Sequence, residues 1–275
     1  MKHDYSVLYS VYHKESPSIM ATSVDSMLAQ TVMPEQIVIV KDGPLTSELD
    51  ALIHNYQKAH PGLFTIVPLQ ENVGLGLALN AGLEACRNEL IARMDTDDIA
   101  IPTRCEKQLE IFNAHPELSI VGSNVDEFYD NPNDIVSVRR VPSAYKDIVT
   151  FSKRRNPFNH PSVMYRKSAL LETGGYGNFR RNQDYELFVR MLNQGYLAQN
   201  SNESLLLFRA NKDNLKRRKS WTKCKGDILI RYDFWKKKYI SFTDFVIAST
   251  GFLVSFIAPS WLFEKLSNTF LRSKK

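Results

Sequence analysis

Three carboxylates stand within four residues, at Asp95, Asp97 and Asp98, directly after the apolar run 89–94, which is typical of a short buried strand. Like charges this close repel one another, so a fold that keeps them together needs a cation or several hydrogen-bond donors. Strand alternation predicts Asp95 and Asp97 on one side, with Asp98 in the turn beyond. All-oxygen ligands suit Mg²⁺ or Mn²⁺, whose open positions substrate phosphates commonly fill. The alternative is an acidic turn capping the next helix, because Pro102 stands where a first-turn proline would.

A fourth carboxylate, Asp184, stands in the first turn of a helix predicted from about 182 to 194 and is the best candidate for a general base. The alternative is an acid that only caps this helix and favours its dipole. A helix N-terminus is expected to lower the pKa of this carboxylate and weaken it as a base. Glu186 points elsewhere and is either a second functional carboxylate or a surface residue. His160, held extended by the following proline, suits phosphate binding, orientation of the base or a structural hydrogen bond.

Several common catalytic patterns are absent from the sequence. It contains neither the P-loop pattern G-x-x-x-x-G-K-[ST] nor the dinucleotide pattern G-x-G-x-x-G, which removes the main support for P-loop hydrolysis and nicotinamide chemistry. It also lacks the Gly-x-Ser-x-Gly nucleophile elbow of serine hydrolases.

The elements that must position these residues alternate between short apolar runs and helical patterns up to about residue 210. This order predicts an α/β fold with a mostly parallel sheet and helices on both faces. Such sheets bind ligands beyond the carboxyl ends of their strands, where Asp42 and the acids at 95–98 both stand. We expect strands at 5–11, 36–41, 64–69, 89–94 and 118–128, and helices at 16–30, 46–60, 74–86, 102–115, 145–154 and 182–194, with a strand entered after 159–162.

Composition places the 275-residue chain among ordinary globular proteins, with 43% hydrophobic and 24% charged residues. Three widely separated cysteines argue for reduced thiols in a cytosolic setting, and the N-terminus shows no signal-peptide pattern. The net charge is +5, and the stretch 209–238 carries twelve Lys or Arg against three Asp. Such a block suits nucleic acid, anionic lipid or a diphosphate, or is simply a solvated helix face.

The last 65 residues differ from the rest, because the basic block is followed by nineteen uncharged residues, 245–263. Serine, threonine, glycine and Pro259 dilute this run, which makes it a poor membrane span. We interpret the region as helices lying in a membrane interface, with apolar residues buried and lysines meeting anionic headgroups. An embedded or re-entrant segment and an ordinary core or dimer contact are the alternatives.

Taken together, these patterns resemble a family 2 glycosyltransferase, the inverting GT-A-fold kind that bacteria use to build surface polysaccharides. The resemblance covers residues 4 to about 210. It implies a transferase domain at 1–210, and the basic and apolar composition of 211–275 predicts a helical, membrane-associated extension. The resemblance rests on blocks that follow the family's order, at 5–12, 26–31, 36–43, 72–80, 92–98, 159–164 and 183–187.

The resemblance also implies roles for individual residues. Asp184 matches the family's catalytic base, and Asp97 and Asp98 match its metal contacts for Mn²⁺ or Mg²⁺. His160 would face the acceptor or a phosphate. The donor-binding residues implied by the family are Ser10, Tyr12, Asp42, Asn72, Asn80 and Asp95, with Asp42 at the uracil edge.

By this resemblance, the chain would transfer a hexose or N-acetylhexosamine from a nucleoside-diphosphate sugar, with UDP the expected nucleotide. The acceptor would be a polyprenyl-diphosphate-linked saccharide at the cytoplasmic face of the inner membrane, where the enzyme is peripheral and its basic tail meets the diphosphate. The alternative function is a non-catalytic, membrane-associated scaffold that binds nucleotide sugars. Binding of nucleic acid is not expected, because no recognised motif accompanies the basic block.

Overall fold

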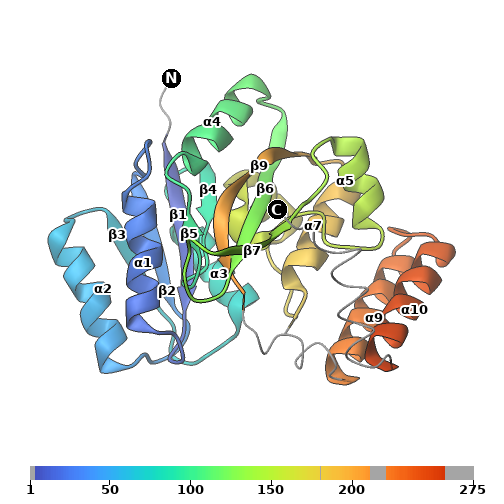
Figure 1. Cartoon of the computed structure of the whole chain (residues 1–275), viewed down its shortest axis with the longest axis horizontal. Helices are drawn as coiled ribbons and strands as arrows, with labels where there is room; N and C mark the ends of the chain where they lie inside the picture. The colour runs from blue at the N-terminus through green and yellow to red at the C-terminus, as the bar shows by residue number, and fades with distance from the viewer. Residues whose placement is uncertain (1–3, 180, 211–220, 258–275) are drawn as a thin grey trace.

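The computed structural model describes residues 4–179, 181–210 and 221–257 (Figure 1). Their strands form one sheet in the order β3-β2-β1-β4-β8-β6-β9-β5, with β7 paired to β6. The strands are β1 (Tyr5–Val11), β2 (Gln36–Lys41), β3 (Phe64–Pro68), β4 (Leu90–Arg93), β5 (Ile99–Ala100), β6 (Leu118–Phe128), β7 (Ile135–Arg139), β8 (Met164–Arg166) and β9 (Leu197–Arg209).

Helices cover both faces of this sheet, which confirms the predicted α/β fold. The helices are α1 (Pro17–Leu28), α2 (Ser47–Ala59), α3 (Leu75–Ala85), α4 (Arg104–Ala114), α5 (Tyr145–Ser152), α6 (Lys167–Thr173), α7 (Gln183–Asn193), α9 (Trp221–Lys236) and α10 (Phe242–Ile257), with a short 3₁₀ turn η1 (His160–Ser162). One apolar cluster joins α1, α2 and α4 to one face of the sheet. A second cluster joins α3, α5, α6 and α7 to the other face.

The half of the sheet formed by β3, β2, β1 and β4 is parallel. The strands β1, β2 and β4 are mostly apolar and almost wholly buried, as expected for strands covered on both sides, whereas the edge strand β3 is mainly half-buried. Because β1 pairs in parallel with both β2 and β4, the chain leaves β2 and β4 at the same edge of the sheet. The loop at Asp42 and the acidic loop at 95–98 therefore lie at one edge.

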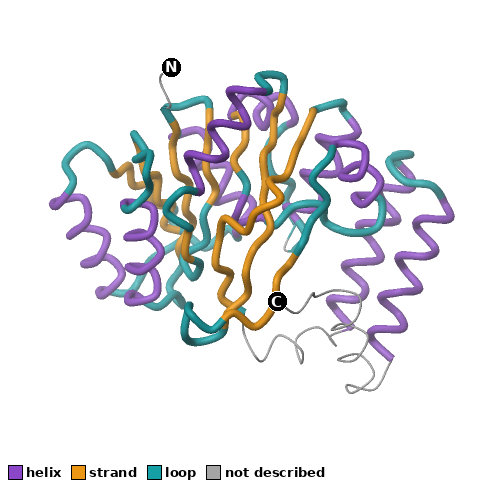
Figure 2. Tube along the Cα trace, turned by 45° about the horizontal axis from the view of Figure 1, so that its top comes forward, coloured by secondary structure: helices purple, strands orange, loops and turns teal. Residues whose placement is uncertain are grey.

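The other half of the sheet is mixed, because β8 runs antiparallel to both β4 and β6. Its longest pairing is the parallel one between β6 and β9, which Figure 2 shows as two long adjacent strands. Our sequence analysis did not predict β9, because polar side chains interrupt it at 199–204. The strand matters for the site, since its last residue, Arg209, reaches the acidic loop.

The helix α3 lies very close to the sheet, and a glycine makes that approach possible. A Cβ atom added at Gly82 would stand only 2.4 Å from a methyl group of Leu8 and 2.5 Å from one of Val40. The loop before α3 is thereby held against the carboxyl ends of β1 and β2, where the site forms.

The helices α9 and α10 lie side by side at one end of the molecule, next to α7 (Figure 1). A third apolar cluster joins them to α7 through Tyr185, Val189, Ile230, Phe234 and Ile240. Among the residues the structure describes, no helix is both long enough and apolar enough to cross a membrane. Pro259 lies outside the described residues.

Candidate active site

The acidic residues lie in a turn and not on a strand. The strand β4 ends at Arg93, and Asp95 to Asp98 form the turn before β5. The expectation that strand alternation orients Asp95 and Asp97 is therefore wrong. The capping alternative is also wrong, because α4 begins at Arg104 with Thr103 as its N-cap. One carboxylate oxygen of each acid lies within 4.8 Å of those of the other two, so the turn itself gathers the charges.

Asp98 is fully buried, and its two oxygens differ. Its Oδ1 accepts a hydrogen bond of 2.9 Å from the backbone N–H of Arg209, while its Oδ2 has no hydrogen-bond partner among the described residues. Burial, and then the charges of Asp95 and Asp97, raise the pKa of Asp98 well above its ordinary value. A buried carboxylate oxygen without a partner indicates a missing cation or donor.

Asp97 and Glu15 extend this acidic cluster toward solvent. Burial, followed by the charges of Asp95 and Glu15, raises the pKa of Asp97 to about 6. Burial raises the pKa of Glu15 as well, and a hydrogen bond with Thr96 partly offsets the rise. Our sequence analysis missed Glu15, because it stands alone after β1 with no local pattern around it.

A buried arginine offsets part of the negative charge. Arg93, at the end of β4, is only 1% exposed and forms an ion pair with Asp95. Although burial disfavours its charge, Asp95 raises the pKa of Arg93 above its ordinary value. Its Nε and Nη1 have no hydrogen-bond partner among the described residues, so Asp95 is its main compensation.

The acidic turn fits a hard divalent cation. Three carboxylates, one with an orphaned buried oxygen and two with raised pKa values, form the donor set that Mg²⁺ or Mn²⁺ prefers. The residues that would hold the ion are Asp97 and Asp98, with Asp95 beside them.

Beside the acidic turn lies a hollow of about 380 Å³. It brings together five of the six donor-binding residues expected from the sequence, together with Asp97 and Glu15. The expected residues that line it are Ser10, Tyr12, Asp42, Asn72 and Asp95.

Asp42 is buried and organises the wall of this hollow. Its carboxylate accepts hydrogen bonds from the backbone N–H groups of Val73 (2.8 Å) and Gly74 (3.2 Å) and from the side chain of Asn72 (3.0 Å). The loop at 72–74 also crosses directly above Gly43, where a Cβ atom would stand 2.7 Å from a backbone nitrogen. Asp42 thus shapes the pocket as well as lining it.

Asn80, the sixth expected donor residue, does not line this hollow. Its amide donates to the backbone oxygen of Tyr176 (2.9 Å) and accepts from the N–H of the same residue (2.8 Å). In the described structure, Asn80 therefore links α3 to the loop that precedes α7.

Asp184 stands in the first turn of α7 and accepts a hydrogen bond of 2.7 Å from the side chain of Asn156. Burial raises its pKa above the ordinary value, and the backbone donors at the helix start only partly offset the rise. The expectation that the helix N-terminus would leave this carboxylate a weak base is therefore wrong. Desolvation is the larger effect here, so the group is a stronger base than a solvated aspartate.

Two neighbours of Asp184 have mainly structural contacts. Glu186 is buried and paired with Arg190 (2.8 Å), so the surface interpretation is wrong. His160 is buried, and its Nε2 lies 2.8 Å from the hydroxyl of Tyr176. Burial, with the charge of Arg93, lowers the pKa of His160 well below its ordinary value, so the ring is neutral. A phosphate would meet this ring without a positive charge.

A second hollow, of about 590 Å³, opens over Asp184 and His160. Asp95 lines both hollows, so the acidic turn and Asp184 line two hollows that share a wall residue. The other walls of the hollow over Asp184 include Asn156, Arg139 and Arg155, together with residues of α9 and α10. Sequence analysis missed Asn156, because nothing local distinguishes it from a loop asparagine.

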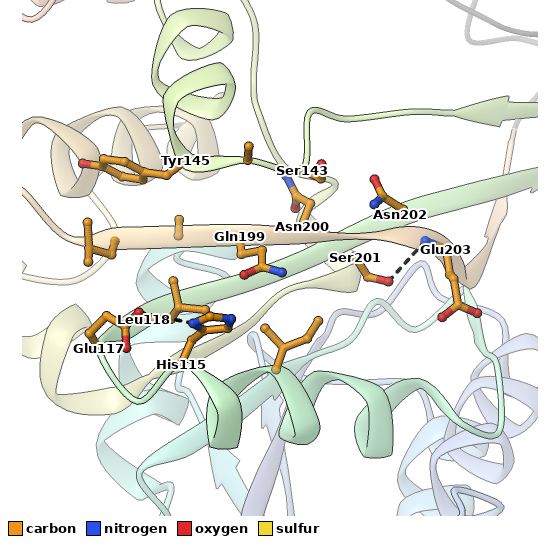
Figure 3. Close-up of a pocket in the computed structure, with 14 residues that line it drawn as sticks. His115, Glu117, Leu118, Ser143, Tyr145, Gln199, Asn200, Ser201, Asn202 and Glu203 are labelled. Atoms are coloured by element: carbon orange, nitrogen blue, oxygen red, sulfur yellow. Dashed lines mark hydrogen bonds and ion pairs between the residues drawn. The ribbon is translucent and has the colours of Figure 1, made fainter.

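A separate hollow of about 750 Å³ lies between α4, β9 and the start of α5 (Figure 3). Its acids are Glu117, which pairs with the exposed His115, and Glu203, which pairs with Lys107. None of the residues predicted to act in chemistry lines it.

Comparison with known proteins agrees with this geometry. Residues 6–174 match the family model described as Glycosyl transferase family 2. The chain belongs to this family. Among relatives, the amylovoran biosynthesis glycosyltransferase of Erwinia amylovora is 36% identical over 250 residues, which is 91% of each chain. An Escherichia coli relative, named UDP-Gal:alpha-D-GlcNAc-diphosphoundecaprenol beta-1,3-galactosyltransferase, is 35% identical and covers 97% of this chain and 98% of its own.

A solved structure with the same architecture confirms the GT-A fold of this family 2 glycosyltransferase. The mannosyltransferase of Pyrobaculum calidifontis, in complex with GDP-Man and Mn²⁺, has a TM-score of 0.63. The match covers 96% of this chain and 72% of the mannosyltransferase at 16% identity.

From the three carboxylates of the acidic turn we predict that a divalent ion stabilises the folded state of this protein. Mn²⁺ at about ten times its dissociation constant should raise the melting temperature by roughly 3–5 °C, because a ligand of the folded state stabilises it. Asp97→Asn should abolish this shift, as measured by differential scanning fluorimetry. The matched control is Asp147→Asn on the exposed face of α5, and an equal loss of the shift in both variants would contradict the assignment.

Proposed function

We propose that this chain is an inverting glycosyltransferase that moves a hexose or N-acetylhexosamine from a UDP-sugar to a hydroxyl of a lipid-linked saccharide. The product would belong to a bacterial surface polysaccharide, such as O-antigen, capsule or exopolysaccharide. The observation that carries the proposal is the meeting of two hollows at Asp95, one containing the acidic turn and the other the buried carboxylate of Asp184. The family membership and the printed function of the Escherichia coli relative support it.

The donor would occupy the hollow of about 380 Å³ beside the acidic turn, which we call the donor hollow. Asp42 has already placed the loop at 72–74 by accepting its N–H groups, so the nucleotide meets a preformed wall. When bound at Asp97 and Asp98, Mg²⁺ or Mn²⁺ would neutralise the charge that develops on the departing diphosphate. Arg93 holds Asp95 in place beside them through its ion pair.

The acceptor hydroxyl would lie next to Asp184, which would take its proton during the attack on the anomeric carbon. Asn156 orients that carboxylate through its hydrogen bond to one of the two oxygens. An attack from the face opposite the leaving group is a single displacement, so the new bond would have inverted stereochemistry.

Asp184→Asn should reduce kcat by at least about a hundredfold, because removal of a general base loses a factor of this order. Donor binding should be unchanged, since Asp184 does not line the donor hollow. Transfer to a lipid-linked acceptor would be followed with a radiolabelled sugar, and UDP-sugar binding by calorimetry. Unchanged turnover in this variant would refute the base assignment.

The raised pKa of Asp184 predicts how kcat falls on the acid side of its pH profile. Protonation abolishes the base, so kcat should fall as the pH drops, with a midpoint above the ordinary carboxyl value of about 3.9. Asn156→Ala should move that midpoint upward, because the amide N–H stabilises the charged carboxylate. kcat would be measured with saturating donor and metal, and a midpoint that Asn156→Ala leaves unmoved would assign the limb to another group.

We further propose that α10 places the enzyme on a membrane surface. Apolar side chains stand exposed along it, and Lys236 and Lys238 are exposed at the turn that precedes it. The side chains of this exposed apolar stripe are Phe242, Val246, Ile247, Leu253, Val254 and Ile257.

A triple variant, Val246→Ser with Val254→Ser and Ile257→Ser, should bind anionic vesicles about tenfold more weakly or worse, because it removes apolar area from the stripe. Co-sedimentation with phosphatidylglycerol vesicles measures this. The control pair Val136→Ser with Leu171→Ser removes exposed apolar side chains elsewhere. Equal binding by the triple variant and the control would contradict the membrane proposal.

A further inference from the structure

Four arginines stand in the wall of the hollow that also contains Asp184, namely Arg139, Arg140, Arg155 and Arg231. Arg139, at the end of β7, and Arg155, just after α5, both line it. The guanidinium of Arg139 pairs with the buried Glu127 at 2.5 Å and lies over the ring of Phe208. That of Arg155 lies over the ring of Phe151, 5.1 Å from its centroid. Aromatic neighbours orient both planar groups.

No carboxylate pairs with Arg155 among the described residues, although the same wall holds several acids. Glu127 is engaged by Arg139 and by Ser137, and Asp184 by Asn156. Asp227, a further acid of the wall, accepts a hydrogen bond of 2.6 Å from the side chain of Asn182. Among the described residues, the acids of this wall are therefore engaged elsewhere, and none of them pairs with Arg155.

The surroundings of Arg155 disfavour its charge in two ways. The Arg155 side chain stays exposed to solvent, yet partial desolvation, and then the positive charge of Arg139, lower its pKa below the ordinary value. Two guanidinium groups that repel each other at the edge of a cavity are stabilised by an anion that contacts both. Planar, forked donors match phosphate oxygens in particular.

The same hollow has an apolar part contributed by the C-terminal helices. Phe252 of α10 and Cys224 of α9 line it, and Phe252 belongs to the helix that carries the exposed apolar stripe. One cavity thus combines the candidate base, four arginines and an apolar wall. A ligand that fits all three has a sugar hydroxyl, a phosphate group and a lipid chain.

We propose that Arg155, together with Arg139, binds the diphosphate that joins the acceptor saccharide to its lipid, an inference that rests on the proposed transferase function. The diphosphate of the donor is excluded from this role, because neither arginine lines the donor hollow. The basic block at 209–238, which our sequence analysis expected to meet the diphosphate, contributes Arg231 to the same wall.

The test measures binding of farnesyl diphosphate to the full chain by isothermal titration calorimetry, with UDP and Mg²⁺ filling the donor hollow. Arg155→Gln should raise the dissociation constant about tenfold to a hundredfold, the usual range for the loss of a charge-assisted contact. Arg155→Lys should recover part of the affinity. The matched control is Lys153→Gln, which removes the same charge two residues away, where the exposed side chain does not line the hollow.

Parallel titrations distinguish the sources of the anion. Farnesol should bind much more weakly than farnesyl diphosphate, and inorganic pyrophosphate should bind more weakly than the lipid form. Equal affinities for farnesol and farnesyl diphosphate would overturn the proposal, as would equal effects of Arg155→Gln and Lys153→Gln. Tight, Arg155-dependent binding of inorganic pyrophosphate alone would overturn the lipid-linked part of it.

Failure of this inference is separable from failure of the proposed function, because the titration requires no transfer. Sugar transfer to a lipid-linked acceptor with an unchanged acceptor KM in Arg155→Gln would refute the subsite and leave the transferase intact. Arg155-dependent binding of farnesyl diphosphate in a chain that transfers no sugar would support the subsite and refute the transferase.

Discussion

Repulsion among the carboxylates at the carboxyl end of β4 is the constraint on which the site depends. Asp95, Asp97, Asp98 and Glu15 lie together, and burial makes their mutual repulsion stronger than it would be in water. The protein offsets this with the buried guanidinium of Arg93 and with backbone donors. The orphaned oxygen of Asp98 remains uncompensated, which is why the arrangement favours a cation.

The charged residues make the two neighbouring hollows different kinds of site. The donor hollow is acidic and suits a metal-bound diphosphate, whereas the hollow over Asp184 carries arginines and suits an anion directly. Asp95 stands between them and belongs to both walls. The proposed inverting transfer would need this arrangement, because the hydroxyl would attack one carbon from the side opposite the departing group.

The C-terminal helices α9 and α10 lie next to the candidate base, because α9 contacts the start of α7. The side chain of Asn182, which caps this helix, donates to Asp227 of α9, and Arg231 of α9 lies over the ring of Tyr185. These contacts join the residues flanking Asp184 to the helices that carry the exposed apolar stripe. One packed cluster thus joins the helix that carries the candidate base to the C-terminal helices.

The local sequence pattern was sufficient to predict the strands in the parallel half of the sheet. The strands β1, β2 and β3 begin at the predicted residues, because uninterrupted apolar runs bounded by turn residues carry their own signal. Parallel order then predicted that Asp42 and the acidic turn would meet at one edge. The strand β9 was missed, because its polar centre is stabilised by pairing with β6, a partner far away in the sequence.

The chain's own order of residues thus determined which carboxylates could act and at which strand ends they stand. Tertiary packing determined the pKa and the hydrogen-bond partners of each carboxylate. The pKa of Asp184 rises instead of falling, because burial among distant segments outweighs the nearby helix N-terminus. The fold alone brings Glu15, Asn156 and Arg155 to the site. The residues around each of them in the sequence form no pattern that predicts contacts with remote parts of the chain. Electric fields and desolvation depend on three-dimensional neighbours, which a linear pattern does not contain.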